Sequence, residues 1–139
     1  FIQSELKKIN INLKIEITPP SILRQGKAKG KYNFFRASWI ADYPSPENYF
    51  DLFYSRNKTP NGPNYTYFMN KKYDSVYNNL KEKKSNIEKS FEILENIIYD
   101  FSPIIPLYYD MSIRLIESNI IGMSNNAINM LNLEEVEKL

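Results

Sequence analysis

The chain has 139 residues, which is enough for one domain with a buried core, and a formal net charge of only +2. This charge gives no reason to expect nucleic acid or an anionic membrane surface as a partner. The sequence has no cysteine and no histidine, so disulfides, thiolate or imidazole nucleophiles, and zinc sites with the usual ligands are excluded.

The first forty residues predict alternating helices and strands. Apolar residues recur at helical spacing over 2–9, and apolar and polar residues then alternate strictly over 11–17, as in a half-buried strand. Prolines break this strand, a short helix is expected over 21–29, and an apolar run over 32–40 predicts a second strand. This alternation is typical of an α/β fold, in which helices cover parallel strands.

Helices are expected to dominate the middle of the chain. The sequence predicts a helix over 46–54, then a loop over 55–69 that is rich in asparagine, proline and glycine. Two amphipathic helices are expected over 71–83 and 85–101. Asn70 is the expected cap of the first of them, and a capping box is expected at the start of the second.

The last third predicts less regular structure. Strands are expected over 104–109 and 113–117, and a short helix over 133–139. Aromatic residues, with 11 tyrosines and 8 phenylalanines, occur throughout the chain. Tyrosine suits wet and adaptable binding surfaces, but an AT-rich genome would produce the same excess.

The stretch over residues 37–50 is the part of the sequence most suggestive of a binding site. The apolar run before it ends on Asp42, and Pro44 and Pro46 then break the run and start a helix that Ser45 can cap. Ligands of open α/β sheets bind in the crevice beyond the carboxyl ends of the strands, so Trp39 and Asp42 are expected together at the mouth of a crevice. The plainer alternatives are an aspartate favoured by the helix dipole and a partly buried core tryptophan.

Three blocks of residues carry a resemblance to a known family. Residues 38–50, which read Ser-Trp-Ile-Ala-Asp-Tyr-Pro-Ser-Pro-Glu-Asn-Tyr-Phe, resemble the C-terminal lobe signature of the extracytoplasmic solute-binding proteins of peptide ABC importers, the oligopeptide- and dipeptide-binding family. Asn64-Tyr65 followed by Tyr73-Asp74, and the Ile-Pro-Leu-Tyr-Tyr run over 105–109, resemble two further blocks.

The resemblance implies a fold and a place in a larger protein. The fold would be α/β, one lobe of a type II periplasmic-binding-protein fold with a small mixed sheet flanked by helices. Residues 1–139 would be a C-terminal lobe fragment of a two-lobe protein. The C-terminal residues, about 115–139, would belong either to this lobe or to the missing one.

The resemblance also assigns ligand-binding roles. The aspartate matching Asp42 receives the α-ammonium group of the peptide, and Trp39 and Tyr65 would line the pocket. The backbone of 37–40 would pair with the extended peptide as an added strand, a mode that accepts many peptide sequences. Ser45 departs from the family, where many members carry an acidic residue, and ligand identity stays open. The expected ligand-binding residues are Ala37, Ser38, Trp39, Ile40, Asp42 and Tyr65.

Other residues are weaker candidates. Arg114 could pair with a peptide carboxylate, although a surface arginine is the simpler interpretation. Tyr108 and Tyr109 alternate on an expected strand, so one of them should be buried. Glu47 and Asp51 could join Asp42 as an acid/base pair or a metal site, but they share one expected helix and no third ligand is evident. Tyr67 is a further weak candidate for the ligand site. No enzyme activity, metal or cofactor is predicted.

The resemblance implies a function in transport. The intact protein would be the substrate-binding component of an ABC transporter, delivering peptides to the permease. It would lie in the periplasm or at the outer face of the cytoplasmic membrane, with a lipid anchor in a missing N-terminal part, because the chain begins at Phe1 without a signal peptide. Half a cleft should bind peptides weakly or not at all. The alternative is a ligand-sensing domain of a transcription regulator.

Overall fold

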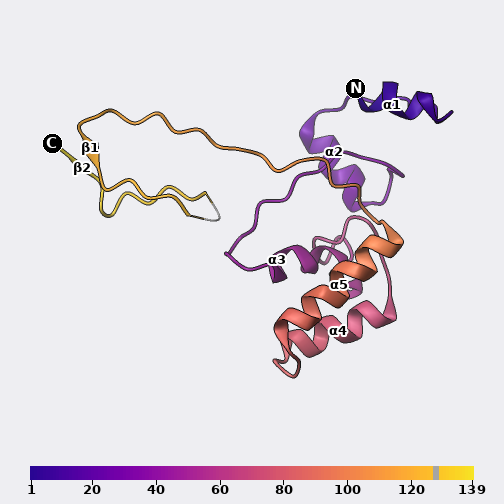
Figure 1. The fold of residues 1–139 in the computed structure, drawn as a ribbon. Helices are drawn as coiled ribbons and strands as arrows, with labels where there is room; N and C mark the ends of the chain where they lie inside the picture. The colour runs from indigo at the N-terminus through magenta and orange to yellow at the C-terminus, as the bar shows by residue number, and fades with distance from the viewer. Residues whose placement is uncertain (127–128) are drawn as a thin grey trace. The chain divides into compact units, whose positions relative to one another are not determined.

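Helices make up most of the regular structure of this chain. The computed structural model describes residues 1–126 and 129–139, and they fall into two units, Phe1–Phe34 and Phe35–Leu139 (Figure 1). None of the helices in these ranges is long and apolar enough to cross a bilayer.

The first unit holds two short helices, α1 (Ile2–Lys8) and α2 (Pro20–Ala28). No residue of α1 is buried. In α2 the buried Gly26 lies directly against the ring of Tyr32, where a Cβ would come within 2.2 Å of the tyrosine Cε2. A larger residue at position 26 would displace the Tyr32 ring, and the Lys31 N–H that donates to the Gly26 carbonyl at 2.9 Å holds the chain after α2 against the helix.

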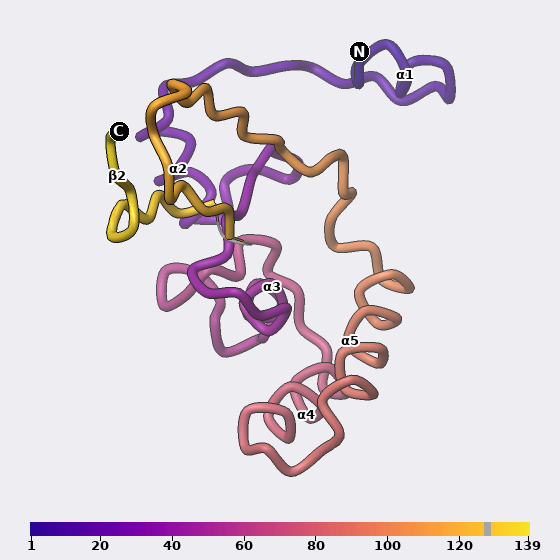
Figure 2. Tube along the Cα trace, turned by 60° about the vertical axis from the view of Figure 1, so that its left-hand side comes forward, coloured from indigo at the N-terminus to yellow at the C-terminus, as the bar shows by residue number. Residues whose placement is uncertain are grey.

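The second unit is built around two longer helices, α4 and α5, which lie side by side in both views (Figures 1 and 2). A short helix and two single 3₁₀ turns precede them, and a pair of two-residue strands follows. The elements are α3 (Glu47–Phe50), η1 (Asp51–Phe53), η2 (Ser55–Asn57), α4 (Lys71–Lys81), α5 (Ile87–Phe101), β1 (Ile120–Ile121) and β2 (Glu137–Lys138).

Aromatic side chains fill the core of this unit. They come from α3 and η1, from the chain just after η1, and from α4, while α5 adds two aliphatic residues. Tyr54 and Tyr77 pack with ring centroids 5.0 Å apart, and Phe50 stacks on Phe91 at 5.3 Å. Some of the many tyrosines of the sequence thus pack in the core, and others lie at the surface. The buried hydrophobic residues are Phe50, Phe53, Tyr54, Tyr73, Tyr77, Leu80, Leu94 and Ile97.

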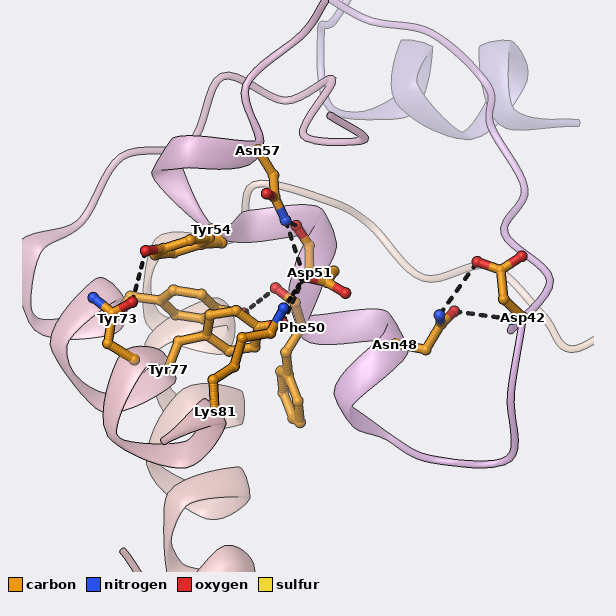
Figure 3. Close-up of polar contacts among 10 residues, drawn as sticks. Asp42, Asn48, Phe50, Asp51, Tyr54, Asn57, Tyr73, Tyr77 and Lys81 are labelled. Carbon is orange, nitrogen blue, oxygen red and sulfur yellow. Dashed lines mark hydrogen bonds and ion pairs between the residues drawn. The ribbon is translucent and has the colours of Figure 1, made fainter. Parts of the chain in front are cut away.

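Asp51 joins η1 to the flank of α4. Its Oδ1 accepts hydrogen bonds from the hydroxyl of Tyr77 at 2.5 Å and from Nδ2 of Asn57 at 3.0 Å, and Lys81 Nζ lies 3.4 Å away (Figure 3). Burial, followed by this hydrogen bond and the charge of Asp51, raises the pKa of Tyr77 far above its usual value. Together with the aromatic core, these contacts fix α3 and η1 on the helical pair.

Both amphipathic helices were predicted, and both begin with an asparagine cap. The side chain of Asn70 accepts from the backbone N–H of Tyr73, as expected. The capping box expected at Ser85 is wrong, because Asn86 occupies the cap position of α5 and accepts from Lys89 N–H. Ser85 Oγ instead shares a hydrogen bond with Ser90 Oγ.

The expected strands over 11–17, 32–40, 104–109 and 113–117 are wrong. Within the described ranges the only sheet is β1–β2, which pairs antiparallel with Ile120 opposite Lys138. The short helix expected over 133–139 is also wrong, since β2 lies there. Alternation of apolar and polar residues predicts which face of a strand is buried, but a strand also needs a neighbouring strand to pair with, and the alternation does not supply one. Ile17, for example, is 93% exposed. Helices with one small sheet agree with the α/β class only at this coarse level.

Candidate ligand-binding site

The turn over residues 43–46 leads into α3 and bends the chain back on itself. Ser45 N–H donates to the carbonyl of Tyr43 at 2.8 Å, and Asn48 N–H donates to the carbonyl of Ser45 at 3.2 Å. The Ser45 hydroxyl accepts from Glu47 N–H at 3.3 Å, while Pro46 occupies the cap position. Serine therefore assists the start of the helix, as expected, one position earlier than a formal cap.

This bend brings Trp39 and Asp42 to the same side chain, that of Asn48 in α3. The amide oxygen of Asn48 accepts from the indole Nε1 of Trp39 at 2.7 Å and from the backbone N–H of Asp42 at 3.2 Å. The amide nitrogen donates to Oδ2 of Asp42 at 3.3 Å, and Figure 3 shows it turned toward that carboxylate. Trp39 is half-buried and Asp42 is exposed. Trp39 and Asp42, which were expected at one site, are thus both hydrogen-bonded to Asn48.

The carboxylate of Asp42 has no cationic partner in the described part of the chain. The ion pairs found there are Lys8–Glu5, Lys81–Asp51 and Lys84–Glu82. Asn48 engages Oδ2, and no donor within the described ranges reaches Oδ1. Such a group can accept an ammonium ion. Because Asp42 is exposed, that pair would contribute only about 0–1 kcal/mol unless the site is covered when a ligand binds.

The phenol of Tyr43 stands next to this carboxylate in sequence, in an acidic setting. Partial burial raises the pKa of Tyr43, and the charges of Glu47 and Asp51 raise it further. The phenol therefore stays neutral at ordinary pH and can donate a hydrogen bond. The local field of these carboxylates favours a cation over an anion.

The other three residues of the expected strand end, Ala37, Ser38 and Ile40, are exposed. Their segment has no regular structure, which corrects the expected strand. No backbone–backbone hydrogen bond within the described ranges involves residues 37–40. Whether these peptide groups pair with a ligand remains a prediction.

Tyr65 comes from a separate element, the loop between η2 and α4. The loop is organised by Asn64, which is fully buried and donates from Nδ2 to the carbonyls of Tyr54 at 3.2 Å and Phe68 at 3.0 Å. Tyr65 itself is half-buried, and its N–H donates to Pro63. The loop conformation is therefore fixed from within, and a pocket role for Tyr65 stays a prediction.

Most of the weaker candidates are engaged in structural contacts. Arg114 donates to the carbonyl and side chain of Asn129 at 2.9 Å. Tyr108 accepts from Arg36 at 2.6 Å. The expectation that either Tyr108 or Tyr109 is buried is wrong, since both are exposed.

The acidic and aromatic candidates nearer α3 divide in the same way. Asp51 is committed to Tyr77 and Asn57, and the Tyr67 hydroxyl accepts from Thr59. Among the residues that the structure describes, no group of three His, Cys, Asp or Glu could hold a metal ion.

The sequence interpretation gave no role to Asn48. It stands six residues after Asp42, within the motif, and a polar residue in the first turn of a helix reads as solvent-facing. What marks Asn48 as important is that its side chain is only 3% exposed. Burial of a polar residue depends on the tertiary fold, so the sequence alone does not reveal it.

Comparisons with known proteins support the resemblance. Residues 1–61 match the family model described as bacterial extracellular solute-binding proteins, family 5 Middle. The chain is 23% identical over 143 residues to the dipeptide-binding protein DppE of Bacillus subtilis (strain 168), a match that covers 99% of this chain and 25% of that relative. The chain thus spans about a quarter of the length of this relative. The resemblance inferred from the motif is confirmed, and the matched residues include Trp39, Asp42 and Asn48.

Proposed function

We propose that this chain is part of a peptide-binding solute-binding protein that works outside the cytoplasm and delivers its ligand to an ABC permease. The observation that carries the proposal is the carboxylate of Asp42, which is unpaired by any described cation, is oriented by Asn48 and lies within the stretch that matches the solute-binding family. An oriented and unpaired carboxylate is suited to a primary ammonium group.

The binding step needs only non-covalent contacts. Asp42 receives the α-ammonium group of the peptide. The backbone of 37–40, which makes no backbone–backbone hydrogen bond with the described residues, offers donors and acceptors along an extended ligand. Trp39 and Tyr65 wall the site. No catalysis and no cofactor take part.

Strong binding requires that the site lose its water. Asp42 is exposed in this chain, so the proposal includes a second lobe that closes over it in a longer protein. Closure would convert a weak surface pair into a desolvated one. The proposed location is the periplasm or the outer face of the cytoplasmic membrane, with a lipid anchor outside these 139 residues.

Calorimetry on the complete protein that contains these residues tests the role of Asp42. The ligands are the dipeptide Ala-Ala and its N-acetylated form, which lacks the ammonium group. Removing one partner of a desolvated pair costs about 2–5 kcal/mol, so Asp42→Ala should weaken binding of the free dipeptide roughly 30-fold or more.

Two controls accompany this measurement. Asp42→Ala should leave the weaker binding of the acetylated dipeptide unchanged, and Asp100→Ala, which removes an exposed aspartate of α5, should leave both affinities unchanged. Equal affinity of the parent protein and Asp42→Ala for the free dipeptide would refute the assignment.

A further inference from the structure

Asn48 is a buried polar residue whose side-chain hydrogen bonds all go to the segment over residues 39–42. It is 3% exposed, and a buried amide is costly unless it is hydrogen-bonded. Three hydrogen bonds of its side chain reach Trp39 and Asp42, through the indole N–H, the backbone N–H and the carboxylate. Both residues belong to the expected ligand site, and the expected peptide-pairing backbone ends directly before Asp42.

The support for Asn48 is rigid. Phe50, two residues further along α3, is buried and stacks on Phe91, and the Tyr73 hydroxyl donates to the Phe50 carbonyl at 2.7 Å. Asp51 follows, with its contacts to α4. Trp39 and Asp42 lie outside any helix or strand, so their geometry relative to α3 depends on contacts such as those of Asn48.

We propose that Asn48 is a positioning residue that holds the Trp39 indole and the Asp42 carboxylate as one preformed pair. The inference rests on the proposed function for its consequence in ligand binding. In the unliganded chain its side chain binds Trp39 and Asp42 directly. With Oδ2 of Asp42 held by the amide, Oδ1 is the oxygen presented to an ammonium group. Preorganisation of this kind lowers the ordering cost at binding.

Trp39 gives a direct readout because it is the only tryptophan of the chain. In the 139-residue chain, Asn48→Ala should shift the Trp39 emission to the red and lower its anisotropy, since the indole loses its acceptor and its anchor. The exchange variant that combines Asn48→Asp with Asp42→Asn keeps an oxygen acceptor for the indole and keeps one amide and one carboxylate in the pair, so it should restore the parent emission. The matched control is Asn64→Ala, which removes another buried asparagine without touching Trp39 or Asp42 and should leave the emission unchanged.

A double-mutant cycle in the complete protein tests the action through Asp42. With Ala-Ala as the probe, Asn48→Ala should lower affinity roughly five- to tenfold, the effect of losing about one hydrogen bond of ordinary strength. In the Asp42→Ala background the same change should cost clearly less, because the carboxylate that Asn48 orients is absent and only its contact with Trp39 is left to lose.

The outcomes separate the two proposals. If Asp42→Ala leaves Ala-Ala binding unchanged, the proposed function fails, while the fluorescence arm still decides the role of Asn48 in positioning the indole. If Asp42→Ala weakens binding but Asn48→Ala costs the same with and without Asp42, the positioning role is overturned. An unchanged Trp39 emission in Asn48→Ala, or no recovery in the exchange variant, overturns it as well.

Discussion

The packed helices of the second unit should be held together by a few deeply buried side chains, and Leu94 tests this directly. Leu94 is 0% exposed and lies in α5 at the contact with the aromatic core. Buried leucine-to-alanine changes cost about 2.7–5 kcal/mol because transfer and cavity terms add. A helical region of this size should have a stability on the order of 3–8 kcal/mol, so Leu94→Ala should remove about half of it.

The assay is urea unfolding of the 139-residue chain followed by far-ultraviolet circular dichroism. The matched control is Leu115→Ala, which deletes the same atoms from a residue that is 97% exposed in the segment between α5 and β1. That change should alter the free energy of unfolding by no more than about 0.5 kcal/mol. A cost at Leu115 equal to or larger than that at Leu94 would refute the argument.

Two further predictions concern tyrosine titration and the loop before α4. Burial raises the pKa of both Tyr73 and Tyr77 well above 10.0. Above pH 10 the unfolded chain therefore binds fewer protons, and stability that is fully present below pH 10 is lost as the pH rises further. Tyr77→Phe should lose stability less steeply than the parent in unfolding curves above that pH, and an equal slope would contradict this. Asn64→Ala should cost about 2 kcal/mol because it removes three hydrogen bonds of a fully buried side chain, two donated to the carbonyls of Tyr54 and Phe68 and one accepted from the Thr66 hydroxyl. Asn61→Ala, at an exposed position of the same loop, should not shift Tm, and equal shifts would contradict the buried network.

The sequence predicts the helices of this chain better than its strands. The 3.6-residue pattern and the asparagine before each amphipathic helix suffice for α4 and α5, because a helix satisfies its own backbone and its caps are local. The alternation over 11–17 and 32–40 has no such local guarantee. A strand exists only where a second segment pairs with it, and the described residues provide that partner only for β1 and β2.

The candidate site divides in the same way. Trp39 and Asp42 are close because only two residues separate them in the sequence. The proline turn that follows them is also visible in the sequence. The residue that joins them is not visible, because nothing local distinguishes the buried Asn48 from the solvent-facing asparagines that the sequence holds in number. The tertiary contacts of the segment over 39–42 with α3 decide that Asn48 is buried.

The short span of the aromatic core has a consequence for the order in which the chain assembles. Among the residues that the structure describes, every buried hydrophobic residue falls between Phe50 and Ile97, so the loops that must close are short and their entropy cost is small. Helical contacts this local form within microseconds to milliseconds. The contacts of this part can therefore form without the last forty residues, whereas β1 gains its neighbour only when the distant β2 segment arrives.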